Sequence, residues 1–220
     1  MTSQARRDPR KDALLTPENC ALVLIDYQAP QINTLRSMDG AQLVANTIAL
    51  AETAVLFGLP LVLSTVGVAG GVNPDTWPSI KRAMSNAISI DRTSINAWED
   101  DDFVAAVRAT GRRKLILGAL WTEACLAFPA LDALRDGFEV FVPVDVVGGG
   151  TSIAAHEAGL QRAMQLGTQP VSWISVLCEL QRDWNRAATS EGMLAIGRRH
   201  GGPWASEIAI KQFVSGGRQV

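Results

Sequence analysis

A cysteine one turn into an expected helix is the first candidate for chemistry in this sequence. The stretch LWTEACLAF follows the apolar run KLILGA, and Thr122 is placed to begin a helix, so Cys125 falls in its first turn. There the helix dipole favours a thiolate, and backbone N–H groups of the turn can hold the oxyanion of a tetrahedral intermediate. These features predict a nucleophile. The alternative is a structural cysteine packed under the helix, because free cysteines are often buried.

Two charged residues are candidates to act with this thiol. Asp26 ends the apolar run ALVLID, which suits a general acid or base, although an aspartate there also suits a turn that caps the next segment. Arg92 lies in IDRTSINAWED. It is interpreted either as a cation that holds Cys125 as a thiolate and orients Asp26, or as a surface arginine paired with Asp91. The residue types alone leave these alternatives open.

Metal and nucleotide sites have little support. His156 and His200 are too few for a histidine-rich metal site, and His156 is interpreted as a helix residue hydrogen-bonded to a loop. Cys20 and Cys178 are assigned structural roles, since three cysteines give no disulfide framework. The glycine-rich segments GVAGG and VVGGG match neither the dinucleotide fingerprint nor the phosphate loop.

Short apolar runs are expected to position these residues. They are rich in Val, Ile and Leu without strict alternation, as in strands covered on both faces, and helical patterns that end at glycines lie between them. This order predicts an α/β fold with a mainly parallel sheet and helices on both faces. The expected strands are residues 21–26, 59–65, 114–119, 138–145 and 170–175, and the expected helices are residues 40–58, 100–111, 122–137 and 151–167.

The carboxyl ends of these strands should meet at one rim, where such sheets bind ligands. We expect Asp26, Thr65, residues 119–122 and Asp145 there. Residues 66–99 are Gly/Pro-rich and irregular, and a loop of this length is expected to cover a site.

The chain is divided into one domain, residues 1–185, and a helical tail, residues 186–220. The tail has no further strand pattern. Its apolar residues need a surface on the domain or on a neighbouring subunit, and they are Trp204, Ile208, Ile210 and Phe213.

The composition predicts a cytoplasmic homo-oligomer. The net charge of -2 and the pI of about 5.7 argue against nucleic acid or an anionic membrane as partner. No apolar run is long enough for a membrane span, and no secretion signal is recognised. Few cysteines suit a reducing compartment. Charged residues make up only 19%, which suggests a surface covered by other subunits.

The sequence resembles the isochorismatase-like cysteine hydrolase superfamily, and most of all its YcaC-like branch, from about residue 15 to residue 185. The resemblance rests on LVLIDYQ, NAWEDDDFVAAVRATGRRKLILGALWTEACLAFPALDALRDGFEVFVPVD, the histidine of TSIAAHEAGLQRAM, and WISVLCELQRDW. It implies a three-layer α/β/α sandwich and a triad of Asp, Lys and Cys, in which Asp26 and Cys125 match the aspartate and the nucleophile. It further implies a non-proline cis peptide at Leu120–Trp121 and an oxyanion hole from the amides of Trp121 and Cys125.

The sequence departs from that pattern at the lysine and at the metal. Arg92 stands where many members have Lys, and Lys81 is less well placed. An arginine keeps the charge but cannot shuttle a proton. The nicotinamidase branch binds a metal near the first aspartate, whereas DYQAPQ has no histidine here, so we expect no metal and no nicotinamidase activity.

These observations predict a cofactor-independent hydrolase that cleaves a small amide or ester-like substrate through an acyl-enzyme, with Asp26, Arg92 and Cys125 as catalytic residues. The predicted substrate-binding residues are Gln28, Asn96, Trp98 and Trp121. The resemblance also implies a homo-oligomer, with an octamer of two stacked rings as the form that similar proteins adopt. Two alternatives stay open. One is a catalytically impaired protein of this fold that acts by metabolite binding or assembly, and the other is an isochorismate-type ether hydrolase that needs no cysteine nucleophile.

Overall fold

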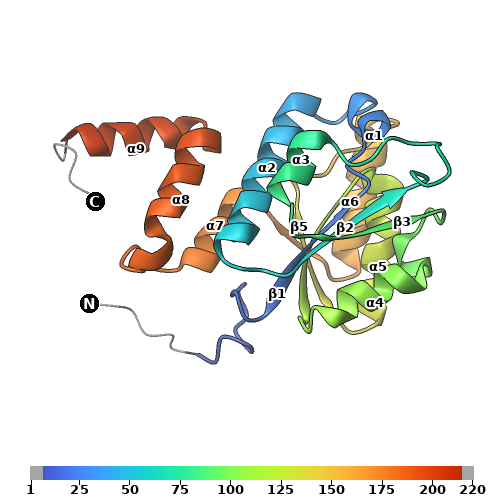
Figure 1. Cartoon of the computed structure of the whole chain (residues 1–220), viewed down its shortest axis with the longest axis horizontal. Helices are drawn as coiled ribbons and strands as arrows, with labels where there is room; N and C mark the ends of the chain where they lie inside the picture. The colour runs from blue at the N-terminus through green and yellow to red at the C-terminus, as the bar shows by residue number, and fades with distance from the viewer. Residues whose placement is uncertain (1–6, 215–220) are drawn as a thin grey trace.

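The computed structural model describes residues 7–214, so the ends of the predicted domain and of the predicted tail lie outside the described residues. Within this range one six-stranded parallel sheet has the order β3-β2-β1-β4-β5-β6 (Figure 1). The strands are β1 Cys20–Ile25, β2 Leu61–Val66, β3 Ile88–Arg92, β4 Lys114–Ala119, β5 Glu139–Pro143 and β6 Gln169–Val171.

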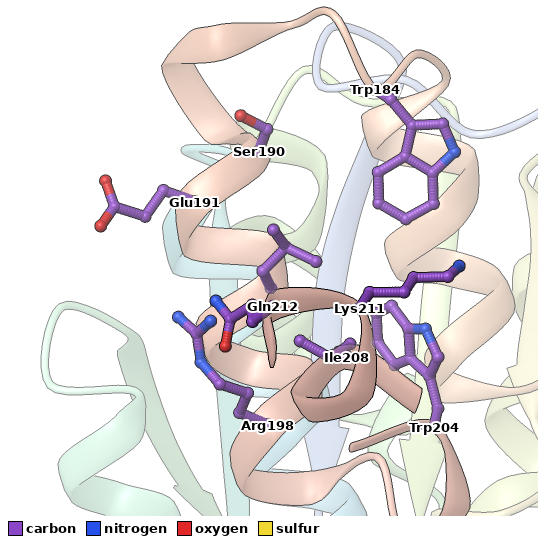
Figure 2. Close-up of a pocket in the computed structure, with 9 residues that line it drawn as sticks. Trp184, Ser190, Glu191, Arg198, Trp204, Ile208, Lys211 and Gln212 are labelled. Carbon is purple, nitrogen blue, oxygen red and sulfur yellow. The ribbon is translucent and has the colours of Figure 1, made fainter. Parts of the chain in front are cut away.

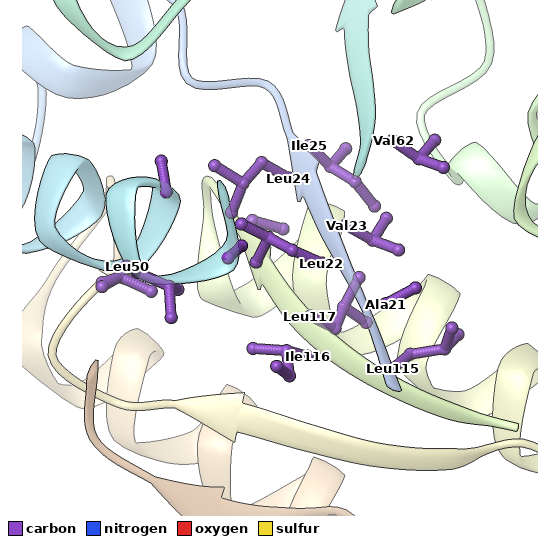
Figure 3. Close-up of a cluster of buried hydrophobic side chains, with 14 of the residues drawn as sticks. Ala21, Leu22, Val23, Leu24, Ile25, Leu50, Val62, Leu115, Ile116 and Leu117 are labelled. Carbon is purple, nitrogen blue, oxygen red and sulfur yellow. The ribbon is translucent and has the colours of Figure 1, made fainter. Parts of the chain in front are cut away.

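The two central strands explain why the sheet is buried. Every residue of β1 and of β4 is buried, and Leu22 pairs in register with Ile116. Continuous apolar runs suit strands with helices on both faces, because neither face meets water. Figure 3 shows side chains of both strands in the core, together with Leu50 from helix α2 and Val62 from β2.

Helices cover both faces and give the predicted three-layer α/β/α sandwich. Helix α2 packs with α3 and α7, whereas α5 packs with α6 and α4 contacts β2 and β3. The helices are α1 Ala29–Asn33, α2 Gly40–Leu56, α3 Pro78–Ala83, α4 Asp101–Ala109, α5 Ala127–Arg135, α6 Ile153–Gln165, α7 Trp173–Gln181, α8 Ala187–His200 and α9 Pro203–Val214. A 3₁₀ turn, Ala97–Glu99, and a π-helical turn, Thr122–Leu126, complete the set within the described range.

Two sequence expectations are wrong in detail. The strand predicted at 170–175 ends at Val171, and helix α7 begins at Trp173 because Ser172 and Ser175 form a capping box. The irregular region 66–99 contains α3 and the edge strand β3. Asp145 follows the carboxyl end of β5, as predicted, and there it accepts hydrogen bonds from the Trp173 amide at the start of α7.

Residues 187–214 contain helices α8 and α9, which extend away from the sheet (Figure 1). Helix α8 packs on α2, and α9 packs on α8. No helix within residues 7–214 is long and apolar enough to cross a membrane.

Candidate active site

The first strand and the edge strand bring together a buried ion pair. Asp26 directly follows β1 and has a φ of 62°, and Arg92 is the last residue of β3. The Arg92 Nη2 lies 2.7 Å from the Asp26 Oδ2, and the two side chains are 0% and 1% exposed. The alternative of a surface arginine paired with Asp91 is therefore wrong. Asp91 instead accepts hydrogen bonds from Thr65 Oγ1 and from the amides of Val68 and Ala69.

Cys125 lies in the turn that connects β4 to α5. The sequence predicts a regular helix from Thr122, but residues Thr122–Leu126 form a π-helical turn before α5, with Trp121 at the N-cap position. Such turns inside helices often occur at functional sites. The Leu120–Trp121 peptide bond is cis, as the resemblance implies. The Cys125 side chain is half-buried, whereas Cys20 is buried and Cys178 exposed.

The Cys125 thiol and the Asp26 carboxyl interact. Burial raises the pKa of the Cys125 thiol to about 12, and the negative charge of Asp26 adds to this effect. The backbone N–H of Trp121 and the charge of Arg92 oppose it without reversing it. Burial also raises the pKa of Asp26, against the charge of Arg92, which lowers it. These shifts favour a neutral Cys125 thiol, with Arg92 paired to Asp26 rather than to the sulfur. The thiolate expected from the sequence stays a prediction.

A glycine turn after β5 holds the π-helical turn that contains Cys125, and the sequence did not reveal this contact. The Thr122 amide donates to the Gly148 carbonyl oxygen, 3.0 Å away. The Glu123 Oε1 accepts hydrogen bonds from the amides of Gly150 and Thr151, each at 3.1 Å, and from the Thr151 hydroxyl. A side chain at Gly150 would meet the Trp121 ring at 2.2 Å. The segment VVGGGT and the glutamate of TEAC were the available signals, but nothing in their spacing paired them.

His156 supports the same turn. Its Nδ1 lies 2.9 Å from the Thr122 Oγ1, which agrees with the interpretation as a hydrogen-bonded helix residue. Burial lowers the pKa of His156, so the imidazole is neutral at pH 7.

The predicted substrate-binding residues separate into two groups. Gln28 and Trp121 lie near Asp26 and Cys125 in the chain, but the Gln28 amide is engaged with backbone atoms of Val66 and Pro74. Gln28 thus anchors the loop after β2. The Trp121 Nε1 donates to the Gln31 carbonyl oxygen, which fixes its ring over Gly150.

Asn96 and Trp98 make hydrogen bonds with acidic residues of α5 and its C-cap. Asn96 donates to Asp132 of α5. Trp98 packs edge-on against Phe138, next to the amino end of β5, and donates to Asp136. Asp26 and Cys125 follow the carboxyl ends of their strands. Trp98 therefore lies near the opposite, amino ends of the strands.

Lys81 is excluded from the triad. Its ammonium forms an ion pair with Asp75, and its side chain is 50% exposed. Among the described residues, no three His, Cys, Asp or Glu side chains gather as metal ligands would. The expectation of a metal-free site stays a prediction.

Comparisons with known proteins agree on one family. The family model of the isochorismatase domain matches residues 20–175. The probable hydrolase YcaC of Escherichia coli (strain K12) is 37% identical over 187 residues, which cover 84% of this chain and 88% of that protein.

Two solved structures of such relatives are similar over nearly their whole length. The structure of YcaC from Pseudomonas aeruginosa, described with hexane-2,5-diol and covalent acrylamide, has a TM-score of 0.84 and 36% identity, covering 91% of this chain and 97% of that chain. The structure of the Escherichia coli YcaC gene product, described as an octameric hydrolase of unknown specificity, has a TM-score of 0.85 and 33% identity, covering 92% of this chain and 98% of that chain.

Proposed function

The chain belongs to the isochorismatase family and is a hydrolase, and we propose that it cleaves a small amide or ester-like substrate through a cysteine acyl-enzyme. The observation that carries this proposal is the buried Asp26 carboxylate, which contacts the Arg92 guanidinium and interacts with the Cys125 thiol. A base fixed beside a neutral thiol is the arrangement that nucleophilic catalysis needs.

In the first step the Cys125 Sγ attacks the substrate carbonyl carbon while Asp26 takes the thiol proton. A carbon–sulfur bond forms, and the carbonyl π electrons move to the oxygen. The amides of Trp121 and Cys125 donate hydrogen bonds to that oxyanion. The influence of the Trp121 N–H on the pKa of the Cys125 thiol supports this role, since it places that donor beside the sulfur.

In the second step Asp26 returns the proton to the leaving nitrogen or oxygen. The bond to the leaving group breaks, and a thioester remains on Cys125. Asp26, again ionised, then deprotonates a water that attacks the thioester carbon, and the proton finally returns to the cysteine sulfur. Because an arginine stays charged throughout, every proton in this cycle moves through Asp26, and Arg92 keeps that carboxylate ionised and oriented.

The first test is the acrylamide reactivity of Cys125, read by peptide mass spectrometry. The similar Pseudomonas aeruginosa protein is described with covalent acrylamide, and acrylamide adds to nucleophilic sulfur. We expect Cys125 to be modified faster than the exposed Cys178, and Asp26→Asn to remove this advantage. Equal rates at both cysteines would contradict the proposal and favour a catalytically impaired protein.

Substrate turnover completes the test. A screen of small amides and esters should find activity that Cys125→Ser abolishes, with Cys178→Ser as the matched control that retains it. Activity that survives Cys125→Ala but not Asp26→Asn would instead identify an ether hydrolase without a cysteine nucleophile.

We further propose that the chain forms a homo-oligomer in the cytoplasm. The similar Escherichia coli protein is described as octameric, and its fold matches most of this chain. The three unpaired cysteines suit a reducing compartment. Light scattering of the purified protein tests the assembly, and a monomer would refute it.

A further inference from the structure

Helix α9 is held on one side by α8. Trp204 and Ile208 lie on this side, and Gly197 of α8 allows their close approach. A side chain at Gly197 would meet the Trp204 ring at 2.4 Å and Ile208 at 2.8 Å. Ile208 is buried, so this contact forms a small apolar core of its own.

The opposite side of α9 is also apolar, but it faces solvent. Three residues share it by helical spacing, about 140–240° around the axis from Ile208. These residues, the outer face, are Ile210, Phe213 and Val214, and they are 62%, 88% and 79% exposed. A helix that is apolar on both sides is normally covered on both sides. In the described part of the chain, the outer face of α9 has no such cover.

A groove beside α9 offers an apolar surface of the right kind. It has a volume of about 410 Å³ and contains Trp184, Leu194, Trp204 and Ile208. Figure 2 shows the rings of Trp184 and Trp204 on one side of this groove, with polar side chains around it. Trp184 is 62% exposed, so no residue between 7 and 214 covers this groove, here called the arm groove.

Helices α8 and α9, here called the arm, are fixed relative to the sheet. Gly192 of α8 lies against α2, where a side chain would meet Leu56 at 2.5 Å. The Arg199 guanidinium of α8 lies 2.5 Å from the carboxylate of Glu52, which belongs to α2. The outer face and the arm groove are therefore presented by a preformed element, which lowers the entropic cost of docking.

We propose that the arm docks on the arm of a second copy of this chain. The outer face of each α9 fills the arm groove of the other copy around a two-fold axis. Each copy supplies one outer face and one groove, so a reciprocal contact buries both at once and closes, whereas a one-way contact would propagate into a filament. The groove also carries both signs of charge, Glu191 and Arg198, so it does not repel a copy of itself.

The choice of a second copy as the occupant rests on the proposed homo-oligomer. The match to the Escherichia coli protein covers 92% of this chain, and the unmatched remainder is shorter than the arm. Part of the arm is therefore shared with a chain described as octameric.

The mass of the assembly in variants of the outer face tests this contact. We expect Phe213→Asp and Val214→Asp to reduce the mass found by light scattering at least twofold, because each places a charge in the arm groove. Val72→Asp is the matched control, since Val72 is also 79% exposed but lies in the loop after β2, and it should leave the mass unchanged. An unchanged mass for Phe213→Asp, or an equal loss for Val72→Asp, would overturn the proposal.

An engineered disulfide between the outer face of one copy and the arm groove of the other tests the same contact directly. In a Cys178→Ser background, Phe213→Cys with Leu194→Cys should form a bond between copies, found as mixed peptides from light and heavy chains. A bond within one chain, or none, would overturn the arm contact. The outcomes separate the two proposals: an assembled wild type with insensitive variants refutes the arm alone, and a monomeric wild type refutes both.

Discussion

The buried Arg92–Asp26 pair can be tested against an exposed pair of the same geometry. In both Arg92–Asp26 and Arg108–Asp136 the guanidinium Nη2 lies 2.7 Å from a carboxylate Oδ2. The first pair has side chains 0% and 1% exposed, and the second 61% and 32%. Burial differs most between them, and Asp136 also keeps a hydrogen bond from Trp98, so the loss of the arginine leaves different carboxylates behind.

We expect Arg92→Met to lower the free energy of unfolding by about 3–5 kcal/mol, because it leaves a buried carboxylate without its partner. Arg108→Met should leave stability nearly unchanged, because water screens the exposed carboxylate. Urea unfolding of both variants measures this difference. Losses of equal size would refute the argument from burial.

The same substitution should also change the pH dependence. Arg92 lowers the pKa of Asp26, so its removal raises that pKa further. An acid whose folded-state pKa lies above the unfolded value favours folding below the unfolded pKa and loses this contribution as the pH rises through the folded pKa. The instability of Arg92→Met should therefore grow with pH, and the acid limb of Cys125 alkylation should move to higher pH. Arg92→Lys should restore the limb, whereas an unmoved limb in Arg92→Met would show that Asp26 is not the base.

Three further predictions concern Cys125 and the residues that hold its turn in place. Labelling of Cys125 by a chloroacetamide should rise a second time above pH 9, beyond the acid limb set by Asp26, because the pKa of its thiol is about 12; rates that stay level above pH 9 would contradict this. Gly150→Ala should cost about 1–3 kcal/mol in urea unfolding and slow turnover, because its Cβ collides with the Trp121 ring, whereas Gly70→Ala has room and should be neutral. Glu123→Gln should lower the rate of acrylamide addition to Cys125 with little change in the mass of the assembly. An unchanged rate would show that Glu123 does not help to position Cys125.

The central sheet could be predicted from the sequence because its strands are buried on both faces. Such strands give continuous apolar runs, as in β1 and β4, and Asp26 is located by the end of one of them. Strand β3 gave no such run, because it lies at the edge of the sheet and only its last residue, Arg92, is buried. The sequence therefore left open whether Arg92 belongs to the site or to the surface.

The electrostatic state of the site could not be predicted, because it depends on burial and on partners distant in sequence. A helix start and a nearby cation favour a thiolate, but the desolvation of Cys125 and the charge of Asp26 outweigh them. This reversal changes what the site must do. A preformed thiolate needs no base for attack, whereas a neutral thiol needs one that is ionised despite its own burial. Arg92 opposes the effect of burial by lowering the pKa of Asp26, so we propose that the arginine acts on Cys125 through the aspartate.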